Sequence, residues 1–401
     1  MSGKERTIMI IGAGRFQLPA ILKAKEMGFK VLALDKDSEA VGSKYADDFE
    51  AIDVKDVEGA IKTARKFDVD GVLSIVSELG VYTTAIVAKE MGLPGLKPEA
   101  AKAVTNKAVM REILEKKELP SPHFVKAYTK EDVLVAIDKL KLPVVIKPTD
   151  NSGSRGVSKI EKMENLEFSF NWAKENARNG ELIVENYIEG EEMTVEAISY
   201  KGRHEILAMS VKKRIPFPYC VSIDLTYPPP YEEKMLLKVC EVVKKALTAL
   251  GVDNGASHSE VLMTKDGPFI VEIAGRGGGF GVFSDIIPLV SGVDPVEQCI
   301  NIAMGFDVDI KAKYQHAAVL RFFTPKHGKI VGISGLEEAR KLPGVYMVEL
   351  EVKVGDILQP IRRDGERPGL IVTYGETRKE AVLNADAAES TVKFHIEENK
   401  K

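Results

Sequence analysis

Apolar and polar positions alternate regularly along the first hundred residues. Short apolar runs at "TIMIIG", "KVLALD" and "DGVLSI" are separated by longer stretches with helical spacing, among them "VEGAIKTARKF" and "VYTTAIVAKEMG". Strands that alternate with helix-length segments indicate βαβ units and a parallel sheet. We therefore expect an α/β domain over residues 1–98. Ligands of such sheets lie beyond the strand carboxyl ends, here near Gly12 to Arg15, Asp35 to Asp37 and Ser77 to Gly80.

The pattern changes character after residue 98. Thr105 to Lys117 has apolar side chains at i,i+4 spacing, which predicts a helix with Thr105 as N-cap. Residues 142–196 alternate short strand patterns with glycine-containing loops and one helix near Phe168 to Ala177, an α+β pattern. A further helix is expected from Glu232 to Leu250. Two apolar runs joined by "TKDG" then predict a β-hairpin.

Composition narrows the class of protein. The 401 residues predict two or three domains, and 44% hydrophobic with 29% charged residues is typical of a globular protein. A formal net charge of -4 supplies no basic field for nucleic acid. The three cysteines form no CxxC pair, so neither a disulfide framework nor a zinc site is indicated, and a reducing cytoplasm is expected. The first apolar run is read as a strand, and no run approaches the roughly 20 residues of a membrane span.

The stretch "PVVIKPTDNSGSRGV" places Lys147 at the end of an apolar run, before a loop of Ser, Gly, Asn and Arg. A Walker A loop is excluded because the lysine precedes the loop and no Gly-Lys pair follows. A flexible flap, with backbone N–H groups, Ser152 and Ser154 over a polyphosphate and Lys147 beneath it, fits the pattern. A polar hairpin with a surface lysine fits equally well. Elsewhere, "GAGRFQ" with Asp35 is a weak dinucleotide fingerprint, since Gln17 occupies the third glycine position.

Two further stretches carry carboxylates. In "LIVENYIEGEEMTVE", a strand through Glu185 to Ile188 could offer its backbone to an adenine edge and Glu192 its carboxylate to a ribose, although an acidic hairpin is by itself more common. In "HSEVLMTKDGPFIVEIAGRGGG", Glu260 and Glu272 lie on the two arms of the predicted hairpin, on one face. Two such carboxylates repel unless a cation relieves the repulsion, which favours Mg²⁺ bridging ATP phosphates. Arg276 and the glycines that follow it would then face the transferred phosphoryl group.

Taken in order and spacing, these motifs resemble the ATP-grasp superfamily, in particular carboxylate-amine ligases of the purine-biosynthesis, carbamoyl-phosphate-synthase-like and L-amino-acid-ligase branches. The resemblance runs from "IMIIGAGRFQLPAILKAKEMGFKVLALDKD" through "VTNKAVMREIL" to "RPGLIVTYGETRKEAVLNA", nearly the whole chain. It implies a pre-ATP-grasp α/β domain over residues 1–98, followed by an antiparallel-sheet ATP-grasp domain over 99–315. A small lid subdomain is expected at about 120–190, and residues 316–401 would close the ATP-grasp domain.

The resemblance also implies roles for individual residues. Lys107 and Lys147 correspond to the two nucleotide-contacting lysines, with Lys147 and Arg276 acting in catalysis. The remaining positions are the flap residues Ser152, Gly153, Ser154, Gly156 and Val157, the adenine contacts Glu185 and Ile188, the ribose carboxylate Glu192, and the metal ligands Glu260 and Glu272, which would bind Mg²⁺ or Mn²⁺. Many members have Asn two residues beyond the second metal-binding Glu, where this chain has Ala274. A non-catalytic ATP sensor is therefore an alternative.

The candidate substrate contacts have weaker sequence support than the nucleotide and metal residues. Glu78 follows a predicted strand and could receive an amine, and His258 could share a face with Glu260, but each fits a structural role equally well. Arg367 resembles an arginine that binds acidic substrates in purine-pathway relatives. The stretch Lys212 to Pro230 is expected to form a loop over the site.

The implied reaction begins with attack of a substrate carboxylate on the γ-phosphoryl group of ATP, which gives ADP and an acyl phosphate. An amine then captures the acyl phosphate. The expected partners are a small-molecule carboxylate and an amine, with no nucleic acid or membrane, and a homodimer is the usual state for an enzyme of this size. Activation of formate or bicarbonate for a purine intermediate is the nearest alternative. An NAD(P)-dependent oxidoreductase is weaker, because it leaves Glu260 and Glu272 unexplained.

Overall fold

The structure is a computed structural model that describes residues 5–216 and 219–397. The chain opens with a parallel sheet of order β3-β2-β1-β4, as the alternating pattern predicts. Its elements are β1 (Thr7–Ile11), α1 (Leu18–Glu26), β2 (Lys30–Leu34), β3 (Asp48–Glu50), α2 (Val57–Lys66), β4 (Gly71–Leu73) and α3 (Glu78–Met91). Strand β1 is buried along its whole length because helices cover both faces of the sheet.

The residues of the weak dinucleotide fingerprint have structural partners. A carboxylate oxygen of Asp35 accepts a hydrogen bond from the Ala13 amide at 2.9 Å. The side-chain oxygen of Gln17 accepts one from the Ile75 amide at 3.0 Å. These contacts hold the loops at the carboxyl ends of β1, β2 and β4 together, so neither residue needs a dinucleotide to explain its presence.

Two helices link this sheet to the rest of the chain, α4 (Pro98–Thr105) and α5 (Lys107–Lys116). The expectation that Thr105 caps the second helix is wrong. Asn106 is the N-cap, and its side-chain oxygen accepts hydrogen bonds from the amides of Ala108 and Val109. Thr105 ends α4 instead, and its hydroxyl bonds back to the Ala101 carbonyl at 2.7 Å. Of two adjacent capping residues, the chain uses the asparagine.

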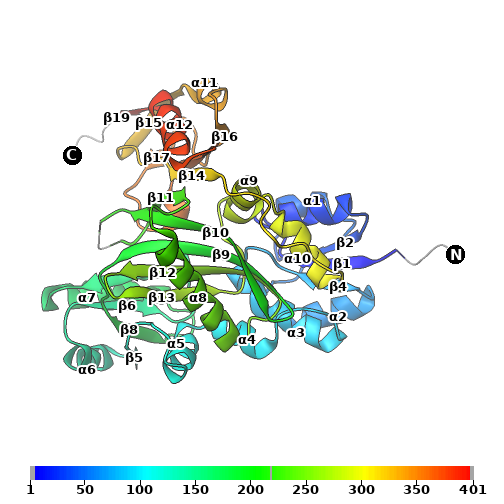
Figure 1. The fold of residues 1–401 in the computed structure, drawn as a ribbon, viewed down its shortest axis with the longest axis horizontal. Coiled ribbons are helices and arrows are strands. Elements are labelled where there is room, and N and C mark those ends of the chain that lie inside the picture. Colours follow the sequence, from blue (N-terminus) through cyan, green and yellow to red (C-terminus); the bar gives the residue numbers. More distant parts are fainter. Residues whose placement is uncertain (1–4, 217–218, 398–401) are drawn as a thin grey trace.

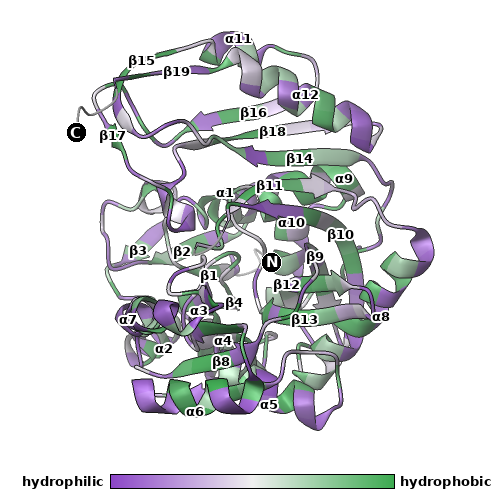
Figure 2. Ribbon diagram, turned by 90° about the vertical axis from the view of Figure 1, so that its left-hand side faces the viewer, coloured by the Kyte–Doolittle hydropathy of each residue, from purple (hydrophilic) through white to green (hydrophobic). Residues whose placement is uncertain are grey.

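A small antiparallel sheet of order β5-β8-β6-β7 follows. Its strands are β5 (Phe124–Ala127), β6 (Val144–Pro148), β7 (Ser158–Ile160) and β8 (Leu182–Asn186), and its helices are α6 (Lys130–Leu140) and α7 (Leu166–Asn176). Helix α6 alternates polar and apolar residues along its length in Figure 2, and its buried side chains Val133, Ala136 and Ile137 join the core of this sheet. Figure 1 places this unit at the lower left.

The largest sheet is antiparallel, with the order β13-β12-β9-β10-β11-β14-β18-β16. Its strands are β9 (Glu191–Tyr200), β10 (Arg203–Arg214), β11 (Ser222–Tyr227), β12 (Gly255–Thr264), β13 (Gly267–Ala274), β14 (Ala317–Phe322), β16 (Val345–Leu350) and β18 (Gly369–Gly375). Helix α8 (Glu233–Ala249) packs on this sheet, whereas α9 (Ile287–Ser291) and α10 (Pro295–Ala303) lie beside the N-terminal unit in Figure 1. The fold class expected from the sequence, a parallel-sheet unit followed by antiparallel sheets, is confirmed.

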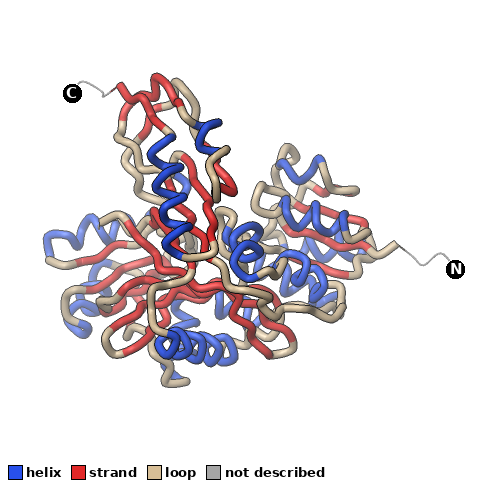
Figure 3. Tube along the Cα trace, turned by 45° about the horizontal axis from the view of Figure 1, so that its top comes forward, coloured by secondary structure: helices blue, strands red, loops and turns tan. Residues whose placement is uncertain are grey.

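The C-terminal residues contribute β14, β16 and β18 to the large sheet and also form a separate three-stranded sheet of order β17-β15-β19. The remaining elements are β15 (Gly328–Ser334), α11 (Leu336–Arg340), β17 (Ile357–Leu358), α12 (Arg378–Thr391) and β19 (Lys393–Glu397). Figure 3 shows this part as an arm that rises from the large sheet. The domain boundaries given above remain predictions.

The expectation of a continuous loop from Lys212 to Pro230 is wrong. Lys212 to Arg214 belong to β10, and residues 222–227 form β11, which pairs with β10 and β14. Phe217 and Pro218 of that stretch lie outside the described residues. The three consecutive cationic residues Lys212 to Arg214 do not alternate with apolar residues, so the sequence gives no strand signal there. No helix among the described residues has the length and apolar character needed to cross a bilayer.

Candidate active site

A pocket of about 540 Å³ lies where the small sheet, the large sheet and the N-terminal unit meet. Most of the residues selected from the sequence line it. They are Lys107, Lys147, Ser152, Gly153, Ser154, Val157, Glu185, Ile188, Glu192, His258, Glu260, Glu272, Arg276 and Arg367. Two of the selected residues, Gly156 and Glu78, are not among the described residues that line the pocket. Each lies next to a residue that does.

On the small sheet, Lys147 at the end of β6 faces a buried carboxylate. Its ammonium lies 2.7 Å from one oxygen of Glu185 on β8, and Nε of Arg111 on α5 lies 2.7 Å from the other. Arg111 also donates to the carbonyl of Val271 on β13, so this triad ties α5 and β13 to the small sheet. All three charged side chains are nearly fully buried.

The electrostatics of this triad favour a charged Glu185. Burial alone raises the pKa of the Glu185 carboxyl, but the positive charges of Arg111 and Lys147 outweigh burial and hold that pKa below its usual range. For Lys147 the balance is opposite. Burial and the nearby cations Arg111 and Lys107 lower its pKa in spite of Glu185. The triad thus brings two basic side chains to one carboxylate, an arrangement that suits a polyphosphate ligand nearby.

Lys107 begins α5 and reaches across to the large sheet. Its ammonium donates to the Asn151 carbonyl at 2.7 Å and lies 2.8 Å from a carboxylate oxygen of Glu272 on β13. The Asn106 cap fixes the first turn of α5 and therefore the position from which Lys107 extends. One lysine thus connects the flap with a candidate metal ligand.

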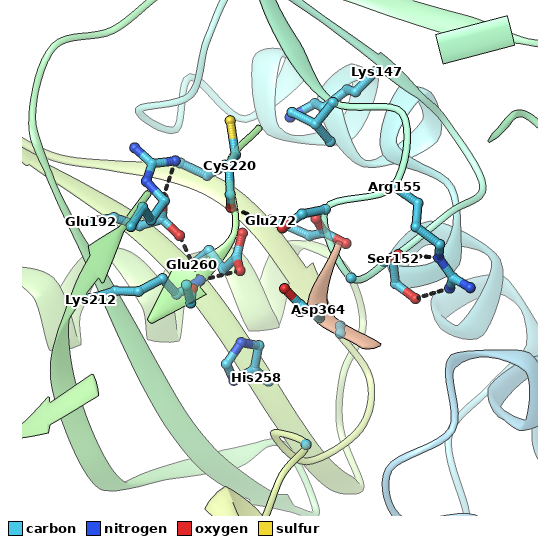
Figure 4. Close-up of a pocket in the computed structure, with 18 of the residues that line it drawn as sticks. Lys147, Ser152, Arg155, Glu192, Lys212, Cys220, His258, Glu260, Glu272 and Asp364 are labelled. Carbon is cyan, nitrogen blue, oxygen red and sulfur yellow. Dashed lines mark hydrogen bonds and ion pairs between the residues drawn. The ribbon is translucent and has the colours of Figure 1, made fainter. Parts of the chain in front are cut away.

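Glu260 and Glu272 are directly paired across the predicted hairpin, next to a register shift between Glu260 and Val261. Figure 4 shows Lys212 of β10 between two carboxylates, with its ammonium 2.6 Å from Glu192 and 2.6 Å from Glu260. Arg214, two residues further along β10, lies 2.6 Å from the second oxygen of Glu192. The proposed ribose and metal carboxylates are thus held by one cationic strand.

These contacts shift the ionisation of both partners. Burial lowers the pKa of Lys212, but attraction to Glu192 and Glu260 outweighs it and raises the pKa above its ordinary value. Burial raises the pKa of Glu260, while the charge of Lys212 holds that pKa well below its usual range. Both groups are therefore charged at neutral pH, and Glu260 is available as an anion to a cationic ligand.

The flap between β6 and β7 closes one side of the pocket. The Ser154 hydroxyl donates to the Cys220 carbonyl at 3.0 Å, and Arg155 folds back to donate to the Ser152 carbonyl at 2.8 Å. Ser154 has a positive φ of 60°. Gly156, with φ of 79°, lies beneath the flap, where an added Cβ would come within 2.8 Å of Asn176 and Pro148. Gly156 therefore acts through backbone shape and close packing.

Arg276 follows β13, and its Nε lies 3.1 Å from a carboxylate oxygen of Glu78 at the start of α3. Its Nη1 donates to the Gly277 carbonyl at 2.9 Å. Glu78 thus positions the guanidinium that lines the pocket. Ala274 is buried, lines the same pocket and pairs with His258 across the hairpin.

His258 shares the pocket face of β12 with Glu260. Its Nδ1 is bonded to a carboxylate oxygen of Glu196, a fully buried residue directly opposite on β9. The other oxygen of Glu196 accepts from the Gly278 amide at 3.3 Å. Since the carboxylate is the acceptor, Nδ1 carries the proton and Nε2 is left as the basic nitrogen.

Arg367 is nearly fully buried beside two aromatic rings, 3.5 Å from the Phe322 centroid and 4.2 Å from that of Phe280. Its Nε donates to the Asp364 carbonyl at 2.8 Å and its Nη1 to the Ser222 carbonyl at 2.9 Å. Burial lowers the pKa of Arg367 to about 10, so it stays cationic at neutral pH. Within the described residues, Nη2 has no hydrogen-bond partner.

The chemistry of the donor set fits a divalent cation with oxygen ligands. The Glu260 and Glu272 side chains are partly exposed to the pocket, at 26% and 20%, and each already has a lysine ammonium beside it. Oxygen ligands of this kind are those that Mg²⁺ prefers. Among the described residues there is no cluster of three or more His, Cys, Asp or Glu side chains that could hold a metal by itself, so further ligands would come from a bound nucleotide.

Sequence reasoning did not identify Arg111, Glu196, Lys212 or Arg214 as site residues. Weak signals exist for each. Arg111 lies one helical turn after Lys107, on a helix face with buried Met110 and Leu114. Glu196 lies four residues beyond Glu192 and therefore on the same strand face, as do Lys212 and Arg214 on β10.

Two family models match the chain. The ATP-grasp domain model matches residues 140–284, and the model described as L-amino acid ligase C-terminal domain 2 matches residues 321–397. The first covers the flap and the carboxylate hairpin. The second covers the strands that contribute Phe322 and the segment that contains Arg367.

The chain is also similar to individual proteins with these domains. The chain is 27% identical over 292 residues to the L-arginine-specific L-amino acid ligase of Bacillus subtilis, which covers 70% of each protein. It is 24% identical over 398 residues to the formate-dependent phosphoribosylglycinamide formyltransferase of Synechococcus sp. strain WH7803, covering 98% of each. The crystal structure of an L-amino acid ligase from Bacillus licheniformis superposes with a TM-score of 0.83 at 22% identity, over 99% of this chain and 100% of that one.

Proposed function

Because the chain belongs to the ATP-grasp superfamily, we propose that it is an ATP-dependent carboxylate-amine ligase that forms an amide or peptide bond. The observation that carries this conclusion is the pairing of Glu260 with Glu272 in a pocket that also contains Lys107, Lys147 and the flap. This arrangement provides cations for a polyphosphate and two oxygen donors for Mg²⁺ in one cavity.

In this account ATP lies between the two antiparallel sheets. Lys147 and Lys107 contact its phosphates, the flap covers them, and Glu192 binds the ribose. The adenine edge meets the backbone near Ile188, whose amide donates no hydrogen bond within the described residues, whereas the preceding Tyr187 amide donates to Pro143. Glu260 and Glu272 would hold Mg²⁺, which supplies positive charge to offset the phosphates.

The reaction then follows from the charges of the site. A carboxylate oxygen of the first substrate attacks the γ-phosphorus of ATP, and the bond to ADP breaks. Arg276, held by Glu78, stabilises the charge on the transferred phosphoryl group. The amine of the second substrate attacks the acyl carbon and phosphate leaves. Nε2 of His258, the nitrogen left basic by Glu196, accepts the proton that the amine loses.

The flap gives this chemistry protection from water. Its hydrogen bond from Ser154 to the Cys220 carbonyl joins it to the connection between β10 and β11 of the large sheet. A closed flap prevents hydrolysis of an acyl phosphate before the amine arrives. No side-chain nucleophile is needed.

A second candidate, activation of formate or bicarbonate for a purine intermediate, is favoured by one observation, the match to the formyltransferase along 98% of both chains. A sensor that binds ATP without turnover is motivated by Ala274. The formate or bicarbonate enzyme differs from the proposed function in the identity of its substrates, and the sensor differs because it releases no ADP. The cytoplasmic location and homodimeric state expected from the sequence stay predictions.

The test is ADP release from Mg-ATP across a panel of amino acids and small carboxylates, offered singly and in pairs. A ligase requires both a carboxylate and an amine, and Glu272→Gln abolishes release. The exposed Glu112, which pairs with Lys126 on the outer surface, provides the control Glu112→Gln. Release only with formate or bicarbonate and a purine-pathway amine would favour the second candidate, and ATP binding without release for every pair would contradict the proposal.

A further inference from the structure

One end of the active-site pocket has a hydrophobic wall beside arginine side chains. The side chains of Leu262, Glu260 and His258 alternate along β12 and all line the pocket, so they mark its long axis at intervals of about 6.7 Å. Beyond His258, the lining includes six hydrophobic residues, Phe16, Val76, Phe280, Val282, Leu320 and Phe322, together with the arginines Arg276 and Arg367.

These residues form one connected wall although they come from distant parts of the chain. The Phe280 ring centroid lies 5.4 Å from that of Phe16 and 5.4 Å from that of Phe322, both in edge-to-face geometry. A Cβ added to Gly279 would lie 3.8 Å from Val76, which places this side chain beside the same loop. Phe16 and Val76 follow β1 and β4, at the carboxyl edge of the parallel sheet where ligands bind.

The wall retains exposed apolar surface. Phe16, Val76 and Phe280 are each only partly buried, although they line a cavity with many charged groups. Phe280 also has a positive φ of 55°, a conformation that is unfavourable for a residue with a side chain. The guanidinium of Arg15 lies over the Phe16 ring at 4.8 Å and that of Arg367 over the Phe280 ring at 4.2 Å, so each covers part of one ring. The remaining exposed apolar area, together with the strain at Phe280, indicates a surface that a ligand completes.

The arginines at this end have acceptors within the chain. Nε and Nη1 of Arg367 bind carbonyl groups, and Nη2, which lies 3.8 Å from a carboxylate oxygen of Asp364, makes no hydrogen bond within the described residues and can donate to a ligand. Arg363 donates to Glu366 at 2.9 Å, and Arg15 is paired with Glu351. A phosphate group needs several convergent donors, whereas one guanidinium nitrogen suits a single carboxylate. Nη2 of Arg367 therefore suits the carboxylate of a substrate.

We infer that one of the two substrates is an α-amino acid with a hydrophobic side chain, of about the size of leucine or phenylalanine, which packs against Phe16, Val76 and Phe280. This inference rests on the proposed ligase function and specifies its substrate class. Burial of the side chain against the wall supplies the binding selectivity, and water leaves the apolar surface when the substrate enters.

The test is isothermal titration calorimetry of amino acids into the protein saturated with Mg-ADP. L-leucine and L-asparagine have side chains of nearly equal size, and leucine is expected to bind at least tenfold more tightly. Across alanine, aminobutyrate and norvaline, affinity is expected to rise about fourfold per methylene. Equal binding of leucine and asparagine, or tighter binding of glycinamide ribonucleotide, would overturn the inference.

The variant Phe16→Ala is expected to weaken leucine binding about tenfold and to leave alanine and Mg-ADP binding unchanged. Phe16→Leu, which keeps apolar volume, is expected to retain most of the affinity, and Mg-ADP binding reports that both variants are folded. The control is Phe306→Ala, because Phe306 is an exposed aromatic stacked on Phe29 outside the pocket lining. A loss in Phe16→Ala no larger than in the control would contradict the assignment.

The ligase function and the hydrophobic substrate site can be refuted separately. Selective leucine binding without ADP release for any carboxylate and amine would refute the ligase function and keep the hydrophobic site. ADP release that needs a carboxylate and an amine, but ignores the side chain and the Phe16→Ala change, would keep the ligase function and refute the site.

Discussion

The buried triad of Arg111, Glu185 and Lys147 allows a quantitative prediction. The change Arg111→Met keeps the length and most of the volume of the side chain and removes its charge. Glu185 then keeps Lys147 as partner, but loses Nε of Arg111 at 2.7 Å, and the Val271 carbonyl loses its donor. The side chain lies on α5 between the small and large sheets, so the loss falls on the contact between them.

The magnitude follows from the bonds removed. Each hydrogen bond to a charged group contributes about 1.5 kcal/mol or more to stability. Loss of two predicts a decrease of about 3 kcal/mol in the free energy of unfolding, in line with the cost of removing one partner of a buried ion pair. The exposed pair of Arg65 and Glu90, at 3.2 Å, gives the matched control. Arg65→Met is expected to cost less than about 0.5 kcal/mol.

The assay is urea unfolding followed by the fluorescence of Trp172, the single tryptophan, which lies on α7 and reports the small sheet. The pH dependence gives a second check. Because the folded-state pKa of Glu185 is lowered, its contribution is present above the unfolded pKa and is lost as pH falls through the folded one. The stability gap between wild type and Arg111→Met should therefore narrow in acid. If Arg111→Met were as stable as Arg65→Met at neutral pH, the triad would not hold the sheets together.

Three further outcomes are expected. Burial raises the pKa of Cys220 from 9.0 to about 12, so at pH 8 its thiolate form is about a thousandfold less populated than in the unfolded chain. Iodoacetamide, with labelling detected by mass spectrometry, should therefore modify Cys220 only after urea is added. Labelling of the native protein at the unfolded rate would contradict this. Gly277→Ala should lose about 1–3 kcal/mol in urea unfolding, since the added Cβ would lie 2.1 Å from Phe283, whereas unchanged stability would mean that the loop shifts freely. Asp35→Ala should lose about 1 kcal/mol by removal of the acceptor for Ala13; unchanged stability together with loss of NADH binding would instead support a dinucleotide role.

Local patterns predicted much of the fold. The strand and helix alternation of the first hundred residues gave the parallel sheet, and "TKDG" gave the hairpin that pairs Glu260 with Glu272. The order of the large sheet was not accessible, because β12 pairs with β9 and β14 with β11 and β18 across long sequence separations. Lys212 to Arg214 and residues 222–227 also form strands because of tertiary pairing, without a local sequence signal.

The candidate site was predictable where chemistry follows a motif and hidden where it follows packing. The flap, both candidate lysines and the carboxylate pair stand in recognisable strings of residues. Glu78 was selected as a substrate contact because it follows a strand, but only the fold places it beside Arg276. Arg111 and Glu196 contact partners that are 74 and 62 residues away in the sequence. A single charged residue on a buried face does not indicate which distant residue it contacts.

The most direct test of the central claim follows one oxygen atom. A carboxylate substrate found in the panel, labelled with oxygen-18 in its carboxyl group, is incubated with Mg-ATP and the amine, and the released phosphate is analysed by mass spectrometry. If the carboxylate is activated as an acyl phosphate, one labelled oxygen appears in phosphate for each amide formed, and Glu272→Gln gives none. Phosphate that carries oxygen from water and none from the carboxylate would contradict the account.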